Sequence, residues 1–464
     1  MLSKAAGKLI SGRPLLLWIL AGCVIGAALP LLVTRFDYLF EINTAEKFIT
    51  VNLVIIIATV IFFYARYRDF MAPHVLIPIF YGIIVLSSAT LIGAVSDHSL
   101  KKIYMAVTLG MLFFSIGGIA SMFFLSHPKR DRGVINMDLT RFKTLSFGLW
   151  ALPVLAVLYA FALSGIPLLS SDPQMARFIA LESVGGYVNN LFILIIPASM
   201  MLIILLRLGT LSRNTVFFCI GLSLLLFMLI GFRSRILYLL VAMFIAVYYY
   251  RYAILGEKIR FSKTFLKGLV VFAVFAVIFA LIGYHRLKLS GEVWDYLPAE
   301  LPIWQLAIFL LLAYLRSLTI VMGRTIELAE TEGFLNGQSY IDMLLSPLPG
   351  FSPQLLDEFI KEKLFPAGFT GGGSPPMIIG EAYINFGLTG VSVTMLICGF
   401  VIALLHKNLL RNRTVSGLVM FSYFYQFLLV SGIFGGLLIF FQYVLAAAVV
   451  LTIIFLSKNR DAQV

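Results

Sequence analysis

Arginine side chains offer the clearest chemistry in this sequence. Arg233 and Arg235 stand in GFRSRILYLL, between two apolar runs, and Arg177 stands in IPLLSSDPQMARF, where charge is otherwise scarce. A guanidinium group is planar and makes paired hydrogen bonds with phosphate oxygens, so several of them converging from distant segments would hold a diphosphate. Further cationic or titratable candidates for this set are His285, Arg286, Arg316 and Arg324.

These arginines also have structural interpretations. Arg233 and Arg235 would extend to lipid phosphates at a membrane surface, as long cationic side chains do. Arg324 has Glu327 and Glu330 at helical spacing and would pair with either one. Both interpretations stay open, because a linear pattern does not show whether the side chains meet in space.

A glycine-rich stretch, FTGGGSPPMIIGEAYINFGLTG, precedes a long apolar run late in the chain. Its three consecutive glycines permit positive φ or a close backbone approach. Ser374 followed by two prolines predicts a capped helix start with proline in the first turn, and exposed amides at such a start favour an anion. Gly372, Gly373 and Ser374 are therefore candidates for binding phosphate or sugar. The alternative is a flexible connector.

Two residues are candidates for a general base. Glu381 lies in the second turn of the helix that this stretch predicts, where a carboxylate would pair with an arginine or accept a proton from a hydroxyl group. His285 ends an earlier apolar run, although a histidine at a helix end is commonly just hydrogen-bonded. Together with Arg235, these residues form the predicted catalytic set.

The sequence lacks familiar signatures of metal and nucleotide chemistry. The predicted outer loops contain no DxD pair, no HExxH helix and no clustered His or Cys, and the chain has no Walker A loop. Its three cysteines, Cys23, Cys219 and Cys398, all fall in apolar runs, which argues against a disulfide framework. The net charge of +13 is spread over short loops rather than gathered with stacking aromatics. We therefore predict no metal, no cofactor and no nucleic-acid partner.

The composition predicts an all-α polytopic membrane protein. Hydrophobic residues occupy 61% of the 464 positions and charged residues 12%, against about 45–50% and 25% in soluble domains. With about 20 residues per span, we expect about 12 transmembrane helices. The predicted spans are 14–33, 48–65, 73–94, 103–125, 145–165, 188–207, 215–232, 235–253, 265–285, 376–405, 414–431 and 436–457.

Basic residues in the loops set the predicted orientation. Clusters around Arg66, Arg130, Arg207 and Lys407 mark cytoplasmic loops, which puts both termini in the cytoplasm. The number of crossings between Lys267 and Lys407 must then be even, and spans nine and ten supply two, so an apolar stretch at 304–322 should be an amphipathic or re-entrant helix in the outer leaflet. The alternative is a thirteenth span.

This topology divides the chain into three parts. Residues 1–285 hold the first nine spans, 286–375 form a large external loop between spans nine and ten, and 376–464 hold the last three spans. The external loop contains six Lys or Arg against ten Asp or Glu, a net charge of −4. We expect it to form a structured cap beside the candidate arginines rather than a separate soluble domain.

Three segments together resemble a known family. The segment SPPMIIGEAYINFGLTGVSVTMLICGF at 374–400 resembles the closing signature of Wzy-type O-antigen or oligosaccharide repeat unit polymerases. LIGFRSRILYLL resembles the G-x-S-R segment shared by those polymerases and the O-antigen ligases, and IPLLSSDPQMARF is similar to the polymerases' outer loop after span five. Arg235, Arg177 and Glu381 match the family's residues in these three segments.

The resemblance implies a fold of the GT-C class and a reaction on the outer face of the bacterial inner membrane. A growing glycan on undecaprenyl diphosphate would pass to the hydroxyl group of a new lipid-linked repeat unit, without a metal or a nucleotide sugar. The product would be an O-antigen, as part of lipopolysaccharide, or another surface polysaccharide. The implied partners are the lipid-linked oligosaccharides, membrane lipid, a chain-length regulator and a flippase.

Two other functions fit parts of the sequence. An O-antigen ligase would need the same donor chemistry, and a purified protein given one lipid-linked repeat unit would separate the two: a ladder of products indicates a polymerase. A flippase or secondary transporter would show paired repeats and a site near the membrane midplane. Here no repeat is evident, and the candidate residues gather at the predicted outer boundary.

Overall fold

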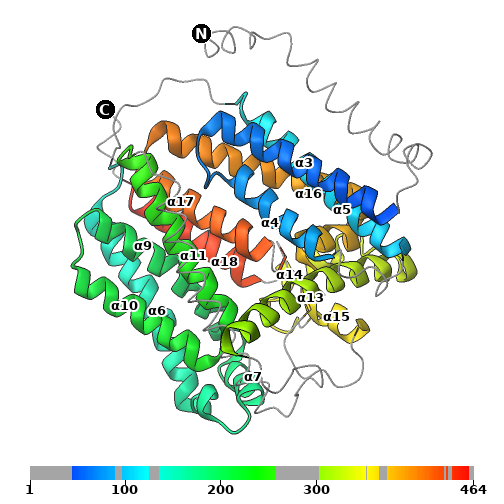
Figure 1. The fold of residues 1–464 in the computed structure, drawn as a ribbon. Helices are drawn as coiled ribbons and strands as arrows, with labels where there is room; N and C mark the ends of the chain where they lie inside the picture. The colour runs from blue at the N-terminus through cyan, green and yellow to red at the C-terminus, as the bar shows by residue number, and fades with distance from the viewer. Residues whose placement is uncertain are drawn as a thin grey trace, which may run out of the picture.

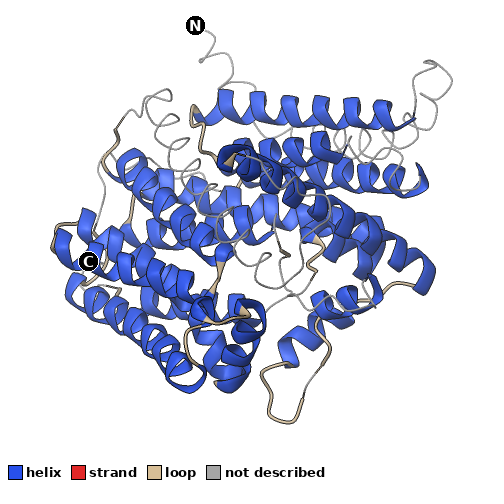
Figure 2. Ribbon diagram, turned by 60° about the horizontal axis from the view of Figure 1, so that its bottom comes forward, coloured by secondary structure: helices blue, strands red, loops and turns tan. Residues whose placement is uncertain are grey.

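The computed structural model describes residues 44–88, 97–124, 135–257, 302–351, 353–364, 374–432, 435–436 and 441–458. Helices form the bulk of these ranges, joined by short loops (Figure 2). The predicted spans 14–33 and 265–285 lie outside the described residues, as do His285, Arg286, Gly372 and Gly373.

The described helices follow the apolar runs of the sequence. The α-helices are α3 (Thr44–Tyr67), α4 (Pro73–Ser88), α5 (Asp97–Ser121), α6 (Leu139–Ser164), α7 (Pro173–Ser183), α8 (Gly185–Leu191), α9 (Ile195–Arg207), α10 (Arg213–Ile230), α11 (Arg233–Tyr249), α13 (Ile303–Glu332), α14 (Gln338–Leu345), α15 (Leu356–Leu364), α16 (Met377–Asn412), α17 (Val415–Gln426) and α18 (Phe441–Leu456). Short 3-10 turns, η2 (Pro167–Leu169) and η3 (Phe192–Leu194), and π-helical turns, η4 (Tyr250–Ile254) and η5 (Phe427–Gly432), extend them.

The helices within the described ranges are those of a polytopic membrane protein. Seven are long and apolar enough to cross a membrane: Ile49–Tyr67, Leu100–Ser121, Leu139–Leu169, Gly185–Arg207, Arg213–Ile230, Arg233–Ile254 and Met377–Asn412. Three shorter apolar helices are Pro73–Leu86, Val415–Val430 and Phe441–Leu456. These helices overlap every predicted span that falls within the described residues.

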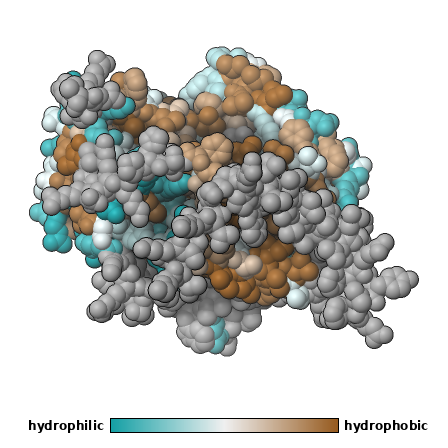
Figure 3. Space-filling view, turned by 90° about the horizontal axis from the view of Figure 1, so that it is seen from above, coloured by the Kyte–Doolittle hydropathy of each residue, from teal (hydrophilic) through white to brown (hydrophobic). Residues whose placement is uncertain are grey.

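Large apolar side chains face outward along these helices. Ile61 on α3 is 62% exposed, Leu155 on α6 is 63% exposed and Phe455 on α18 is 75% exposed. Figure 3 shows apolar side chains gathered over part of one face of the molecule. In a bilayer such residues contact acyl chains, whereas water would penalise an apolar surface of this extent.

The helices form two groups with α17 and α18 between them (Figure 1). In the first group α16 packs along α5, and α3 and α4 pack beside them. Gly117 and Gly399 allow the close approach, because a Cβ on Gly117 would overlap the carbonyl of Leu396 and one on Gly399 would overlap that of Phe114. In the second group α9 is central and contacts α6, α10 and α11.

The predicted external loop contains three helices. Within its described part, α13 packs against α4, α5 and α16, and α14 and α15 follow it in the chain. The helix predicted at 304–322 is present but longer, because α13 continues to Glu332. Its relation to the membrane stays a prediction.

One end of the bundle collects basic side chains. Lys407 lies within electrostatic range of Arg66 and Arg411, and Arg413 comes close to Gly256, just after α11 and η4. We call this the basic end. α11 runs from Arg233 to the basic end, so the first turn of α11 lies at the opposite end of the bundle.

A buried carboxylate lies near the basic end, between α3 and α4. The side chain of Asp69, 1% exposed, accepts hydrogen bonds from the hydroxyl groups of Tyr248 (2.7 Å) and Tyr249 (2.8 Å) and from the backbone N–H of Met71 (2.9 Å). His406 Nε2 lies 3.3 Å from its Oδ2. We call these five residues the Asp69 centre; they connect α11, α16 and the turn between α3 and α4.

Candidate functional site

A tight helical hairpin places two arginines at the end of the bundle away from the basic end. α10 ends in a glycine motif: the N–H of Gly231 donates to Met228 O (2.9 Å) and the N–H of Phe232 donates to Phe227 O (2.9 Å). Gly231 has a φ of +85°, a conformation that glycine adopts without strain. α11 begins immediately afterward with Arg233, so Arg233 and Arg235 both lie in its first turn.

A second helix start places Arg177. The side chain of Asp172 accepts hydrogen bonds from the N–H groups of Gln174 (3.0 Å) and Met175 (3.0 Å), and Pro173 occupies the first helical position of α7. Aspartate before proline is a favoured helix start. Arg177 follows one turn later and is half-buried.

The three arginines form one cationic cluster. Arg177 lies within electrostatic range of Arg233 and of Arg235. Burial, and then the charge of Arg233, lowers the pKa of Arg177 to about 10. At neutral pH all three guanidiniums are charged, and the positive charge of each one repels the other two. We call Arg177, Arg233 and Arg235 the arginine cluster.

Arg235 is held by uncharged groups. Its guanidinium carbon lies 3.8 Å from the centre of the Phe232 ring, and its NH2 donates to Oε1 of Gln442 on α18 at 3.2 Å. Among the described residues, its NH1 is buried without a hydrogen-bond partner, as is Nε of Arg177. Neither Arg177 nor Arg235 belongs to an ion pair in the described part of the chain. Buried charges normally have a partner. The unpartnered donors of Arg177 and Arg235 are therefore available to bind an anion.

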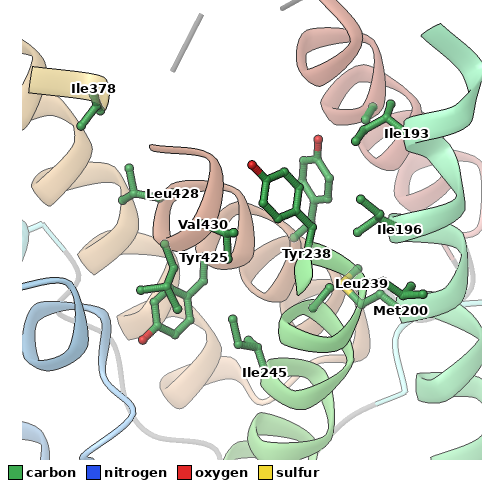
Figure 4. Packing of buried hydrophobic residues seen from close by; sticks show 14 of the residues in the cluster. Ile193, Ile196, Met200, Tyr238, Leu239, Ile245, Ile378, Tyr425, Leu428 and Val430 are labelled. Atoms are coloured by element: carbon green, nitrogen blue, oxygen red, sulfur yellow. The ribbon is translucent and has the colours of Figure 1, made fainter. Parts of the chain in front are cut away.

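A small pocket adjoins the arginine cluster. It is lined by Ile193, Ile196, Pro197, Tyr238, Tyr423, Gln426, Phe427, Tyr443 and Ala446. Two of its lining residues, Tyr238 and Tyr443, are within electrostatic range of Arg235. Figure 4 shows Tyr238 between Ile193 and Ile196 on one side and Val430 on the other. The lining is mostly apolar and aromatic, and the volume of about 10 Å³ is close to that of a single water site.

The other predicted cationic residues lie apart from these contacts. Arg316 and Arg324 are exposed on α13. Arg324 NH1 pairs with Glu327 Oε2 at 3.0 Å, which confirms the predicted structural pair. No described contact joins either arginine to the cluster, and their role in binding substrate stays a prediction.

Glu381 is buried in α16, with an exposure of 1%. It lies within electrostatic range of Tyr340 and Cys398, and its backbone carbonyl accepts a hydrogen bond from Asn385 Nδ2 at 2.8 Å. Asn385 also donates to Ser339 Oγ at 2.8 Å. The described contacts thus place Glu381 where α14 meets α16, and its role as a base stays a prediction.

The helical conformation of α16 is interrupted within the segment EAYINFG, directly after Asn385. Phe386 and Gly387 have non-helical backbone angles, with a φ of +62° at Gly387. The N–H groups of Leu335 and Asn336 donate to the carbonyls of Ile384 (2.9 Å) and Asn385 (3.0 Å). Backbone N–H groups from another segment thereby satisfy the carbonyls near the break, as a membrane environment requires.

The predicted cap of α16 is wrong. The helix begins at Met377 with Pro376 as its N-cap, without a capping side chain. Ser374 is instead buried, and its N–H donates to the carbonyl of Asp357 on α15 at 3.1 Å. The two prolines therefore precede the first turn, and Ser374 attaches the start of α16 to α15. Its predicted part in substrate binding remains untested.

Sequence reasoning missed Gln442 and Tyr443. The available signal was a polar residue, Gln442, in the first turn of an otherwise apolar helix. Polar groups at membrane depth usually face protein or a functional cavity. Their place beside Arg235, however, depends on how α18 packs, and nothing local in the sequence specifies it.

Together, the fold and the site define a polytopic helical membrane protein with a cluster of guanidiniums at one end of its bundle. The chain belongs to the O-antigen polymerase family: the family model described as Putative O-antigen polymerase matches residues 69–446, most of the chain. This confirms the resemblance seen in the sequence and ties the protein to polymerisation of surface polysaccharide repeat units. Comparisons with curated proteins and with solved structures gave no match.

Proposed function

We propose that this protein transfers a growing glycan from undecaprenyl diphosphate to the hydroxyl group of a lipid-linked repeat unit, on the outer face of the bacterial inner membrane. In this reaction the acceptor oxygen bonds to the anomeric carbon of the donor sugar. The bond from that carbon to the diphosphate oxygen breaks, and undecaprenyl diphosphate leaves with the bonding electrons. The acceptor proton passes to a base, for which Glu381 and His285 remain the candidates.

The observation that carries the proposal is the arginine cluster with its unpartnered buried donors. Negative charge grows on the diphosphate as the glycosidic bond breaks, and fixed cations nearby stabilise that charge more than they stabilise the bound substrate. Arg235 NH1 and Arg177 Nε are buried without partners in the described ranges, so the free protein would offer them to the diphosphate. This electrostatic role requires neither a metal nor a nucleotide sugar.

The proposed orientation follows from charge at the two ends of the bundle. The basic end, with Arg66, Lys407 and Arg413, would face the cytoplasm by the usual bias of basic residues. The arginine cluster lies at the opposite end of α11 and would therefore open to the outer face. The aromatic side chains near the cluster, Tyr238 and Tyr443, would contact the first part of the lipid or the first sugar.

Purified protein in lipid nanodiscs, given a single lipid-linked repeat unit, tests this function. The proposal expects a ladder of chains on the lipid carrier and release of undecaprenyl diphosphate. Products that appear only after addition of a different acceptor, such as a lipid A core, would indicate a ligase instead. Movement of intact lipid-linked sugar across the membrane with no new glycosidic bond would indicate a flippase.

A further inference from the structure

Gln442 is the described residue that fixes the direction of the Arg235 guanidinium. Its Oε1 accepts a hydrogen bond from Arg235 NH2 at 3.2 Å, while the ring of Phe232 covers one face of the guanidinium at 3.8 Å. With one edge and one face held, NH1 is left buried and without a partner from the part of the chain that the structure describes. Two contacts thus leave this planar group little freedom to rotate.

The packing of α18 against α17 fixes the position of Gln442. The backbone carbonyl of the next residue, Tyr443, accepts a hydrogen bond from the Tyr423 hydroxyl at 3.1 Å. The Tyr443 ring also lies 5.3 Å from the ring of Phe427. The first turn of α18 is therefore attached to α17 and η5, so the amide reaches Arg235 from a rigid support.

The neutrality of Gln442 distinguishes it from the usual partner of a buried arginine. A carboxylate at this position would hold the guanidinium more strongly, through a charge-assisted hydrogen bond, but it would also cancel the positive charge. An amide oxygen orients the same group and leaves its charge intact. An amide partner therefore favours the binding of an anion by Arg235.

We infer that Gln442 is a positioning residue, which orients Arg235 and, because it is uncharged, keeps the positive charge of the arginine cluster available to the diphosphate. The inference rests on the proposed function, in which Arg235 binds the diphosphate. If Gln442 had only a structural role, Gln442→Glu would keep its activity, because a glutamate there would preserve or strengthen the hydrogen bond to Arg235.

The test compares Gln442→Glu with Gln442→Ala. Both are purified in nanodiscs, and KM and kcat are measured with the lipid-linked repeat unit of the host strain, per mole of folded protein. We expect Gln442→Ala to lose about 3- to 10-fold in kcat/KM and Gln442→Glu about 10- to 100-fold, below the loss for removing a whole oxyanion donor. The loss in Gln442→Glu should include a raised KM, because the neighbouring guanidiniums keep the new carboxylate ionised.

Two further variants complete the experiment. Asn214→Asp makes the same change from amide to carboxylate on α10, at an exposed position, and should retain wild-type kinetics. If Gln442→Glu retains more activity than Gln442→Ala, the inference is overturned while the proposed function stands. If Arg235→Ala retains full activity, the proposed diphosphate site itself fails, and the role of Gln442 fails with it.

Discussion

The two ends of α11 bury charge in opposite ways. At the basic end, the carboxylate of Asp69 accepts three hydrogen bonds, from Tyr248, Tyr249 and Met71. In the first turn, roughly 20 Å away by the rise of a helix, the described residues give Arg235 one neutral hydrogen-bond acceptor, Gln442, and leave its buried NH1 with none. A fully partnered charge costs little further energy and connects helices, whereas a cation short of partners gains most when an anion binds.

The largest expected effect comes from removing the unpartnered cation. Arg235→Ala should reduce polymer formation by about 10²- to 10³-fold, the usual cost of losing one oxyanion donor. Because the native charge is poorly compensated, the thermal unfolding midpoint should not fall. The measurement is the chain-length ladder from cells that lack the native gene, together with the unfolding midpoint of the purified protein.

Arg251→Ala is the matched control for Arg235→Ala. Arg251 follows the other end of α11 and pairs with Glu257 at 2.6 Å on the surface, so its removal should leave the ladder unchanged. Equal losses of long chains in both variants would show that the cluster has no special role. A collapse of protein level in Arg235→Ala alone would assign Arg235 to the fold instead.

The second effect concerns the Asp69 centre and should appear in stability. Asp69→Ala leaves the buried Tyr248 hydroxyl and the Met71 N–H without their acceptor, while the Tyr249 hydroxyl keeps Met71 O, and the change should cost about 3 kcal/mol in free energy of unfolding. Asp69→Asn retains one carbonyl oxygen and should cost less. The thermal unfolding midpoint of each variant measures this loss of stability. Activity per folded molecule should match the wild type, and a selective loss of activity with an unchanged midpoint would contradict a structural role.

Asp357 on α15 is a third buried ionisable group, and its Oδ1 also lacks a partner among the described residues. Unlike a guanidinium, a carboxyl group can take up a proton instead of a ligand. Burial, and then the charge of Glu358, raises the pKa of Asp357 from 3.8 to about 7. Between these values the folded state binds more protons than the unfolded state, so stability falls as pH rises and the full penalty is reached above about pH 7.

Asp357→Asn should therefore stabilise the protein more at pH 8 than at pH 5. The difference between the two pH values should be about 2–3 kcal/mol in free energy of unfolding. Glu362→Gln, an exposed change on the same helix, serves as the control and should show no such trend. Retained polymer formation in Asp357→Asn would support a structural role, while inactivity would place Asp357 in the catalytic machinery.

The smallest effect comes from one hydroxyl group of the Asp69 centre. The Tyr249 hydroxyl contacts Asp69 Oδ2 and Met71 O, each at 2.8 Å. Tyr249→Phe should cost about 1–2 kcal/mol, the value of a buried hydrogen bond to a charged group. Tyr159→Phe, at a position 53% exposed, should be neutral. Equal midpoints for both variants would show that the hydroxyl contributes nothing.

Much of the fold was predictable because lipid imposes a simple pattern. Apolar runs of about 20 residues predict spans, and the described helices follow those runs closely. The hairpin at Gly231 was also local in origin, which is why Arg233 and Arg235 could be placed at one boundary. Arg177 joined them because the Asp-Pro start of α7 turns the chain at the same end of the bundle.

The remaining parts depended on contacts between distant segments. The Asp69 centre combines residues from the turn after α3 with residues of α11 and α16, and no local motif connects them. Gln442 reaches Arg235 only through the packing of α18. The cap expected at Ser374 was wrong because Ser374 N–H bonds to Asp357 O on another helix, a tertiary contact that local propensity does not reveal.

A structure of the protein with undecaprenyl diphosphate bound, determined by electron cryomicroscopy in nanodiscs, tests the central claim most directly. We expect the diphosphate to lie within hydrogen-bond distance of Arg235 NH1 and Arg177, with Gln442 still bonded to Arg235 NH2. A diphosphate bound instead beside Arg316 and Arg324, or at the basic end of the bundle, would contradict it.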